Sequence, residues 1–291
     1  MILTVIKIIL ECIAALVILY MLAIMPRIFH RPDTTLFQKK FFAHRGLHDN
    51  VTDAPENSMA AFRKAVEAGF GMELDVQVTK DGVPVIFHDF TLNRICGAEG
   101  KPAECTYEEL QAYTLCNSGE RIPRLADMLA LVDGRVPLIV EIKAETADVS
   151  CCVVMDEMLR AYKGAYCIES FNPMVLWWFR RNHKEAVRGQ LSSNFRKEGV
   201  YWNVFYFAMT HLLFNFLTKP DFIAYNHEFR EEPGRRICRR LYRLPAAAWT
   251  IRSEQEEKNC TMACTQGRLN SSTPMPPMRA KNEPRKPTTW A

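Results

Sequence analysis

Residues 72–89, MELDVQVTKDGVPVIFHD, decide the fold class of this chain of 291 residues. Apolar and polar residues alternate from Met72 to Val78, and a second apolar run covers residues 84–88, which is the pattern of two β-strands. The TKDG link between them is a tight turn, too short for the crossover helix that two parallel strands require. We therefore predict two strands joined by a turn, and an irregularity at this point of their sheet.

Similar strand patterns recur along the rest of the chain, and helical patterns separate most of them. Eight strand candidates that alternate with helices are typical of a barrel. We predict an α/β fold, an irregular TIM (β/α)8 barrel. The other strand candidates are residues 41–44, 137–143, 166–170, 187–191, 221–225 and 246–251, and the helix candidates are residues 58–69, 107–113, 125–132, 151–162 and 173–182.

The N-terminus is a separate apolar segment. Residues 2–25 are apolar except for Thr4, Lys7 and Glu11, and about 24 helical residues can cross a hydrocarbon core of ~30 Å. No Ala-x-Ala-type cleavage site follows, which favours one retained transmembrane helix over a signal peptide. Basic residues follow the span and none precedes it, which predicts a single-pass cell-membrane protein with its bulk in the cytoplasm. These residues are Arg27, Arg31, Lys39 and Lys40.

Composition divides the chain into four predicted segments. We expect a transmembrane anchor at 1–26, a basic linker at 27–40, the barrel at 41–257 and a flexible tail at 258–291, which is rich in Pro, Ser and Thr. Residues 202–217 are almost wholly apolar but too short for a second span. They predict a buried barrel helix, or a helix on the membrane surface near the anchor.

Charge and cysteine content narrow the class of protein. The net charge of +4 is mild and dispersed, unlike the concentrated basic patch of a nucleic-acid binder, so no nucleic-acid partner is expected. None of the ten cysteines shows the C-x-x-C spacing of a zinc site. We expect free thiols in a reducing compartment.

Three carboxylates are predicted to converge in the barrel. Strand side chains alternate, so Glu73 and Asp75 share one face of their strand, and Glu141 and Lys143 share one face of another. Buried acids repel one another unless a cation neutralises them, and oxygen ligands favour Mg²⁺ or Ca²⁺. The alternative is a pair of solvated acids on an exposed strand face.

Two histidines end predicted strands on either side of these acids. His44 and His88 can move protons near neutral pH, although a lone histidine is more often structural. Arg45 and Lys143 add positive charge that suits a phosphate. A cation, two imidazoles and basic groups together indicate phosphodiester cleavage, in which one histidine deprotonates the nucleophile and the other protonates the leaving oxygen.

Several motifs carry a resemblance to a known family. AHRGLHDN, APENSMAAF, MELDVQVTKDGVPVIFHD, LIVEIK, IESFNP and AAAWTI follow the order and spacing of the glycerophosphodiester phosphodiesterase family, over roughly residues 41–251. The resemblance implies a TIM barrel and metal-dependent hydrolysis of glycerophosphodiesters to glycerol phosphate and an alcohol, a phosphoric diester hydrolase activity. It also implies site roles: acid/base catalysis by His44 and His88, metal binding by Glu73, Asp75 and Glu141, phosphate binding by Arg45 and Lys143, and a pocket lined by Glu56, Phe171 and Trp249.

Two alternatives to this function stay open. A relative could cleave lysophospholipid headgroups, as phospholipase D-like members of the superfamily do. A non-catalytic product is the other alternative, because the polar, proline-bearing segment after residue 257 departs from the family pattern that closes the barrel. The residues leave undecided the alcohol headgroup, the choice of Mg²⁺ or Ca²⁺, the route through water or a cyclic phosphate, and the oligomeric state.

Overall fold

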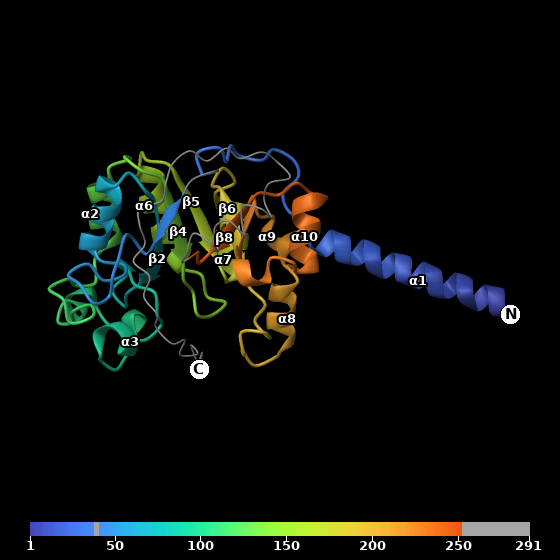
Figure 1. Cartoon of the computed structure of the whole chain (residues 1–291), viewed down its shortest axis with the longest axis horizontal. Coiled ribbons are helices and arrows are strands. Elements are labelled where there is room, and N and C mark those ends of the chain that lie inside the picture. The colour runs from blue at the N-terminus through green and yellow to red at the C-terminus, as the bar shows by residue number, and fades with distance from the viewer. Residues whose placement is uncertain (38–40, 252–291) are drawn as a thin grey trace. The chain divides into compact units, whose positions relative to one another are not determined.

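The computed structural model describes residues 1–37 and 41–251, which form two compact units. The larger unit is Pro32–Gln190, and the smaller unit combines Met1–Arg31 with the described residues from Leu191 onward. Figure 1 labels the elements along the chain. They are α1 Ile2–Ala23, β1 Phe42–His44, α2 Met59–Glu67, β2 Gly71–Val78, β3 Pro84–Ile86, α3 Asn93–Cys96, η1 Pro102–Glu104, α4 Tyr107–Leu110, α5 Leu125–Val132, β4 Leu138–Ile142, α6 Cys151–Ala161, β5 Tyr166–Ser170, α7 Pro173–Asn182, β6 Arg188–Ser192, α8 Val204–Thr210, α9 Asn215–Thr218, β7 Phe222–Asn226, η2 His227–Phe229, α10 Pro233–Arg240 and β8 Ala246–Trp249.

The larger unit is built on a parallel sheet in the order β1-β2-β4-β5-β6. The α-helical crossovers α5, α6 and α7 connect its strands, as parallel pairing requires. All eight predicted strands are present, but β3 is not one of the parallel strands of a barrel. It pairs antiparallel with β2, because the TKDG turn reverses the chain directly.

The two faces of this sheet differ in chemistry. Met72, Leu74 and Val76 of β2 point to the helix-covered face, where they join a core with Leu138, Val140 and Ile142 of β4. Alternation along each strand places the intervening residues on the opposite face. That second face therefore carries Glu73 and Asp75 of β2 and Glu141 of β4, each at most 7% exposed.

A second apolar cluster fixes the end of β3. Val85 and Phe87 pack with the short helices α3 and α4 through Leu92, Ile95 and Leu110, and all five side chains are at most 5% exposed. A capping box at Thr106 and Glu109 starts α4. This packing holds the backbone on both sides of His88 in one position.

The smaller unit contains the apolar helix α1 and the parallel pair β7–β8. Ile24, at the C-cap of α1, is fully buried against Leu212, Ile223 and Cys238. The rest of α1 carries no buried residue, and its length and mean hydropathy suit a membrane span.

Residues 202–217 do not form the single buried helix that was one of the two predictions. They contain α8 and α9, two helices too short for that, with Asn203 as the N-cap of α8. Met209 and Leu212 are buried, whereas Trp202, Phe205 and other apolar side chains are exposed. The prediction of a buried helix was wrong because it assumed that every apolar run is buried.

Two further predictions concern the cysteines and the C-terminal tail. The eight cysteines in the described part of the chain are all free thiols, as their irregular spacing predicts. The predicted flexible tail at 258–291 lies outside the described residues.

Candidate active site

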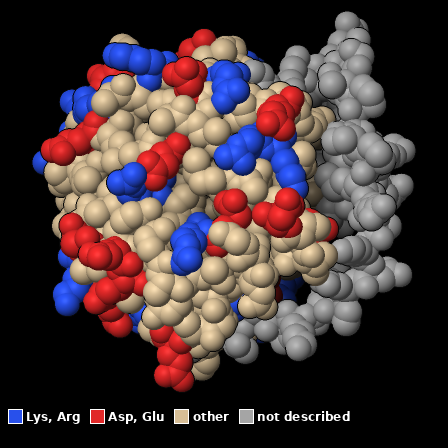
Figure 2. Space-filling view, turned by 90° about the vertical axis from the view of Figure 1, so that its left-hand side faces the viewer, with Lys and Arg blue, Asp and Glu red and all other residues tan. Residues whose placement is uncertain are grey.

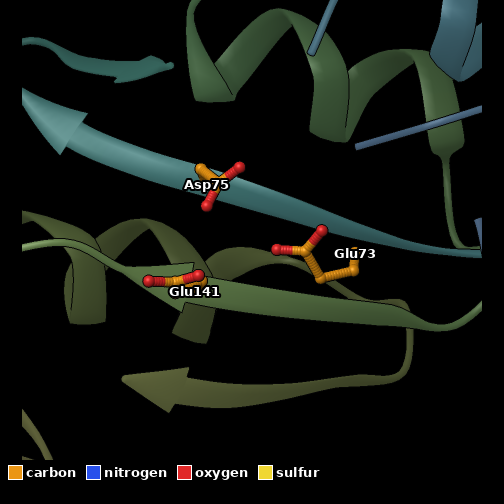
Figure 3. Close-up of side chains that lie close together, drawn as sticks. All are labelled: Glu73, Asp75 and Glu141. Atoms are coloured by element: carbon orange, nitrogen blue, oxygen red, sulfur yellow. The ribbon is translucent and has the colours of Figure 1, made fainter. Parts of the chain in front are cut away.

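The acidic cluster lies on neighbouring strands of the larger unit. Figure 3 shows Glu73 and Asp75 on β2 and Glu141 on β4, with their carboxylates turned toward one another. One carboxylate oxygen from each residue lies within 4.8 Å of the others. The register explains the convergence, because Asp75 and Glu141 are direct partners across the parallel pair β2–β4.

Burial and mutual repulsion raise the pKa values of two of these acids, whereas neighbouring cationic groups lower the pKa of the third. Burial, with the charges of Asp75 and Glu141, raises the pKa of Glu73 well above its ordinary range. Burial also raises the pKa of Glu141 to about 7, although the Lys143 ammonium opposes that shift. Burial works against the charge of Asp75 too, but Lys143, His88 and Arg45 hold the pKa of Asp75 well below its ordinary value.

The donor set fits a hard divalent cation. All three groups are buried carboxylates, and oxygen ligands of this kind suit Mg²⁺ or Ca²⁺. Two of the three, Glu73 and Glu141, resist ionisation in the protein alone. A cation would remove that resistance, because it offsets the repulsion and replaces the hydration that burial removes.

Arg45 and Lys143 supply positive charge next to the acids. Lys143 Nζ lies 2.7 Å from Glu141 Oε1 and 3.2 Å from Asp75 Oδ1. Arg45 Nη1 lies 2.7 Å from Glu56 Oε1, and its Nε lies 3.3 Å from Asp75 Oδ2. Burial works against both cations, but the neighbouring carboxylates raise the pKa of Arg45 and of Lys143, so both stay charged.

The HRG turn brings His44 and Arg45 to the acids. Arg45 has a left-handed backbone, with φ of +57°, and its N–H donates to Glu73 Oε2 at 3.0 Å. Gly46 follows with φ of +80°, and a Cβ there would lie only 3.0 Å from Ala61, so a glycine is required. His44 Nε2 lies 3.8 Å from Glu73 Oε2.

His44 is held in its neutral form. Its side chain is 33% exposed, yet the surrounding protein disfavours its charge. Burial and the Arg45 guanidinium lower the pKa of His44 to about 3. A neutral imidazole beside a carboxylate can exchange a proton with an incoming group.

His88 is oriented by a carboxylate. Its Nδ1 lies 2.5 Å from Asp89 Oδ1. Burial works against the charge of Asp89, but hydrogen bonds from His88 and Arg94 lower the pKa of Asp89 to about 2. An ionised carboxylate only accepts, so the proton of neutral His88 lies on Nδ1 and its Nε2 is the nitrogen that can accept a proton.

Four residues of this region, Asp89, Arg94, Asn57 and Glu169, were not predicted from the sequence. Arg94 bridges Glu56 and Asp89 with hydrogen bonds of 2.6–2.9 Å. Asn57 donates to Asp75 Oδ2 at 2.9 Å. Glu169 of β5 is the direct partner of Glu141, so Asp75, Glu141 and Glu169 form one row across β2, β4 and β5. An acid directly after the apolar residues Cys167 and Ile168 of a predicted strand was the available signal for Glu169.

The hydrogen bond from Asn57 to Asp75 is expected to stabilise the fold. Asn57→Ala removes the amide donor to the buried Asp75 carboxylate, and we expect it to lower the free energy of unfolding by about 1–3 kcal/mol more than the control does. Asn117→Ala is the matched control, because Asn117 has the same φ of +58° and an exposed side chain. Urea unfolding of both variants measures the difference, and equal losses would contradict a role of the Asp75 contact in stability.

The three predicted pocket residues lie in different surroundings. Glu56 is buried and bound by Arg45, Arg94 and Asn50. Phe171 is half-buried and directly follows β5 in the larger unit. Trp249 ends β8, which belongs to the smaller unit.

A cavity of about 210 Å³ opens beside the cluster in the larger unit. Its wall includes Lys143, and Gln77, Phe90, Lys101 and Glu145 are among its other lining residues. Figure 2 shows Lys and Arg side chains interspersed with Asp and Glu side chains on the face in view. That face therefore carries charges of both signs and no continuous basic field.

Known proteins share this sequence pattern. The model of the glycerophosphoryl diester phosphodiesterase family matches residues 44–265. A glycerophosphodiester phosphodiesterase of Caldanaerobacter subterraneus subsp. tengcongensis is 38% identical over 128 residues, covering 42% of this chain and 51% of that protein. Glycerophosphodiester phosphodiesterase 1 of Homo sapiens is 28% identical over 192 residues, covering 59% and 57%. The chain thus spans about half the length of the curated relatives it matches.

Solved structures share the fold. A phosphodiesterase of Oleispira antarctica, solved with the product sn-glycerol-3-phosphate, matches with a TM-score of 0.61 and 23% identity, covering 79% of this chain and 91% of that one. A putative glycerophosphoryl diester phosphodiesterase of Agrobacterium tumefaciens matches with a TM-score of 0.62 and 16% identity, covering 76% and 88%. These likenesses show a TIM-barrel-like fold with a curled parallel sheet.

Proposed function

Because the chain belongs to the glycerophosphoryl diester phosphodiesterase family, we propose that it hydrolyses glycerophosphodiesters to glycerol phosphate and an alcohol. One observation carries the proposal. The three buried carboxylates, the cations of Arg45 and Lys143 and the imidazoles of His44 and His88 lie close together in the larger unit. Together these groups can bind a divalent cation, hold a phosphate and transfer protons, which are functions that hydrolysis of a phosphodiester can use.

The basic residues orient the substrate in this proposal. The phosphate carries a negative charge, and the guanidinium of Arg45 and the ammonium of Lys143 bind it against the acidic cluster. Glu56 positions Arg45 through the 2.7 Å contact to Nη1, and Arg94 in turn holds Glu56 with two hydrogen bonds. A divalent cation bound by Glu73, Asp75 and Glu141 would supply further positive charge against the phosphoryl oxygens.

The two histidines divide the proton transfers. His88 Nε2 accepts the proton of the nucleophile as its oxygen forms a bond to phosphorus, because Asp89 keeps the other nitrogen protonated. The bond from phosphorus to the alcohol oxygen breaks, and the leaving oxygen takes a proton from His44. The bound phosphate anion favours the protonated form of His44 that this step requires, against the burial that lowers its pKa.

We further propose that α1 anchors the enzyme in a membrane, with residues 41–257 as the catalytic barrel. The support is a helix of 22 residues with mean hydropathy 2.7 and no buried residue. Arg27 and Arg31 follow this helix, and the positive-inside rule then places the catalytic barrel in the cytoplasm.

An activity assay tests the proposed reaction. The full chain in detergent is expected to release glycerol phosphate from glycerophosphocholine, and EDTA is expected to stop that release. Lysophosphatidylcholine is the second substrate, since α1 and the exposed apolar residues near α8 favour a lipid substrate. Turnover of lysophosphatidylcholine alone would replace the first function with the second, and turnover of neither would overturn both.

A further inference from the structure

The exposed part of α1 matches the thickness of a bilayer. Residues 2–19 are all exposed, and Tyr20 is the first residue of α1 that the smaller unit partly covers. At 1.5 Å per residue the exposed part is about 27 Å long, close to a hydrocarbon core of ~30 Å. In a membrane-spanning α1, Tyr20 therefore lies at the bilayer surface, where tyrosine is enriched.

The smaller unit holds the end of α1 firmly. Asn215 Nδ2 donates to the Ile24 carbonyl oxygen at 3.0 Å, and Cys238 Sγ lies 3.4 Å from the same oxygen. Tyr242 donates its hydroxyl hydrogen to the Met21 carbonyl oxygen at 2.9 Å. These contacts come from α9, α10 and the loop after α10, so the helices follow the tilt of α1.

Exposed apolar side chains lie next to this junction. A Cβ on Gly234 would lie 2.8 Å from the His211 carbonyl oxygen and 3.1 Å from the Tyr20 hydroxyl, so the C-terminal end of α8 lies beside Tyr20. Figure 1 shows α8 and α9 near the base of α1. The apolar residues that α8, α9 and the preceding loop expose are Tyr201, Trp202, Val204, Phe205, Phe207 and Phe216, each at least 45% exposed.

Arginines accompany them on α10. Arg236 and Arg240 of α10 are exposed, and so is Arg243 in the loop after this helix. Cys238 of the same helix contacts the end of α1. Aromatic rings beside arginines suit the headgroup layer, where rings rest on the acyl boundary and guanidinium groups bind phosphates.

We propose that α8, α9 and α10 form a membrane-contact surface, made of the six exposed apolar residues and the three arginines, that rests on an anionic phospholipid bilayer. This inference rests on the proposed span of α1. The bilayer is the favoured occupant because the surface is continuous with the base of that span and its charge complements anionic headgroups. It fixes the orientation of the smaller unit by a second contact besides α1.

Tryptophan quenching tests the contact in the full chain. The protein is reconstituted into vesicles of phosphatidylcholine with a minority of phosphatidylglycerol, whose acyl chains carry bromine near the glycerol end. We expect quenching of part of the tryptophan emission, and loss of that quenched part in Trp202→Phe. The matched control is Trp178→Phe, a tryptophan that packs on the core of the larger unit and keeps the quenched part. Equal quenching in wild type and Trp202→Phe would overturn the proposal.

Two further measurements separate the causes of failure. Carbonate extraction reports the span, because alkaline carbonate strips surface-bound protein and leaves spanning helices in the bilayer. Quenching does not report the span, because α1 contains no tryptophan. If the chain stays in the vesicles but Trp202 is not quenched, the proposed membrane-contact surface is wrong and the proposed span of α1 stands. If carbonate releases the chain, the proposed span is wrong. If two copies of the chain crosslink and Trp202 is not quenched, the surface is a dimer interface and the proposed lipid contact is wrong. Arg236→Gln with Arg240→Gln is expected to lower the quenching in phosphatidylglycerol vesicles to the level in phosphatidylcholine alone, and unchanged quenching would contradict the role of the arginines.

Discussion

His88→Ala is expected to lower the rate of glycerol phosphate release by about 10²–10⁴-fold, and His44→Ala by a similar factor, the range for loss of a general acid or base. Each variant removes one proton transfer and leaves the carboxylate cluster and both cations in place. Neither imidazole is fully buried, with side-chain exposures of 15% and 33%, so the thermal unfolding curves are expected to stay close to that of the wild type.

The histidine prediction has an internal control. His48→Gln replaces an imidazole four residues from His44 whose Nδ1 lies 3.0 Å from the His44 carbonyl oxygen, and glutamine can keep a hydrogen bond there. We expect His48→Gln to retain activity within a few-fold of the wild type. Near-full activity of His88→Ala would show that His88 is not the base.

The pH profile of activity tests whether Asp89 controls the tautomer of His88 or only lies close to it. Asp89→Asn removes the ionised acceptor that keeps the His88 proton on Nδ1, and the amide can hold the ring in either tautomer. We expect kcat to fall while KM changes little, with the acidic limb of the pH profile displaced. A change confined to stability would assign Asp89 a structural role.

Removal of the divalent cation is the second large effect, and its size should depend on pH. The pKa of Glu141 is raised to about 7 and the pKa values of Glu73 and Glu169 are raised as well, whereas carboxyls of an unfolded chain ionise near 4.3. Between these limits the folded chain keeps protons that the unfolded chain has lost. These three raised pKa values therefore make the metal-free chain lose stability as pH rises from about 4.3 toward 7, by about 1.4 kcal/mol per pH unit for each proton retained.

A cation binds the ionised acids, so it should restore stability where it was lost. We expect Mg²⁺ or Ca²⁺ to raise the urea midpoint strongly above about pH 7 and weakly near pH 5. EDTA is expected to lower activity by about 10²-fold or more, because a bound cation contributes several kcal/mol of charge stabilisation. If neither cation changed the urea midpoint at any pH, the proposal that this site binds a metal would be wrong.

Glu73→Gln separates the two consequences of the cluster. Glutamine neither takes up a proton on folding nor buries a charge, so the metal-free variant is expected to be more stable than the metal-free wild type near neutral pH. The same variant is expected to lose the stabilisation by cation and most of the activity. Glu67→Gln, on the exposed side of α2, is the matched control and should change neither quantity. A Glu73→Gln chain that still gained stability from the cation would exclude Glu73 as a ligand.

Strand periodicity predicted a large part of this geometry. The i, i+2 spacing placed Glu73 with Asp75 because side chains alternate along β2, and the tight TKDG turn explained why His88 lies close to them in sequence. The same turn carried the information that β3 runs antiparallel, yet counting β3 as one of eight barrel strands ignored it. Local pattern predicts the elements more reliably than their pairing partners.

Register and side-chain networks could not be predicted in this way. The alignment of Asp75, Glu141 and Glu169 depends on how β2, β4 and β5 slide against one another, and residues far apart in the chain decide that. Arg94 lies on the short helix α3, where no periodicity marks it, and only the fold brings it to Glu56. The exposed residues of α8 show that apolar composition alone does not imply burial.

The smaller unit is assembled from the two ends of the chain, and this has a consequence for synthesis on the ribosome. Asn215 reaches the Ile24 carbonyl across 191 residues, and Cys238 reaches it across 214. Domains generally fold as they emerge, so the larger unit, contiguous in sequence, can form while the partners of Ile24 are still untranslated. Insertion of the first helix and its capture by α9 and α10 are therefore separate events in time, with the folding of the acidic site between them.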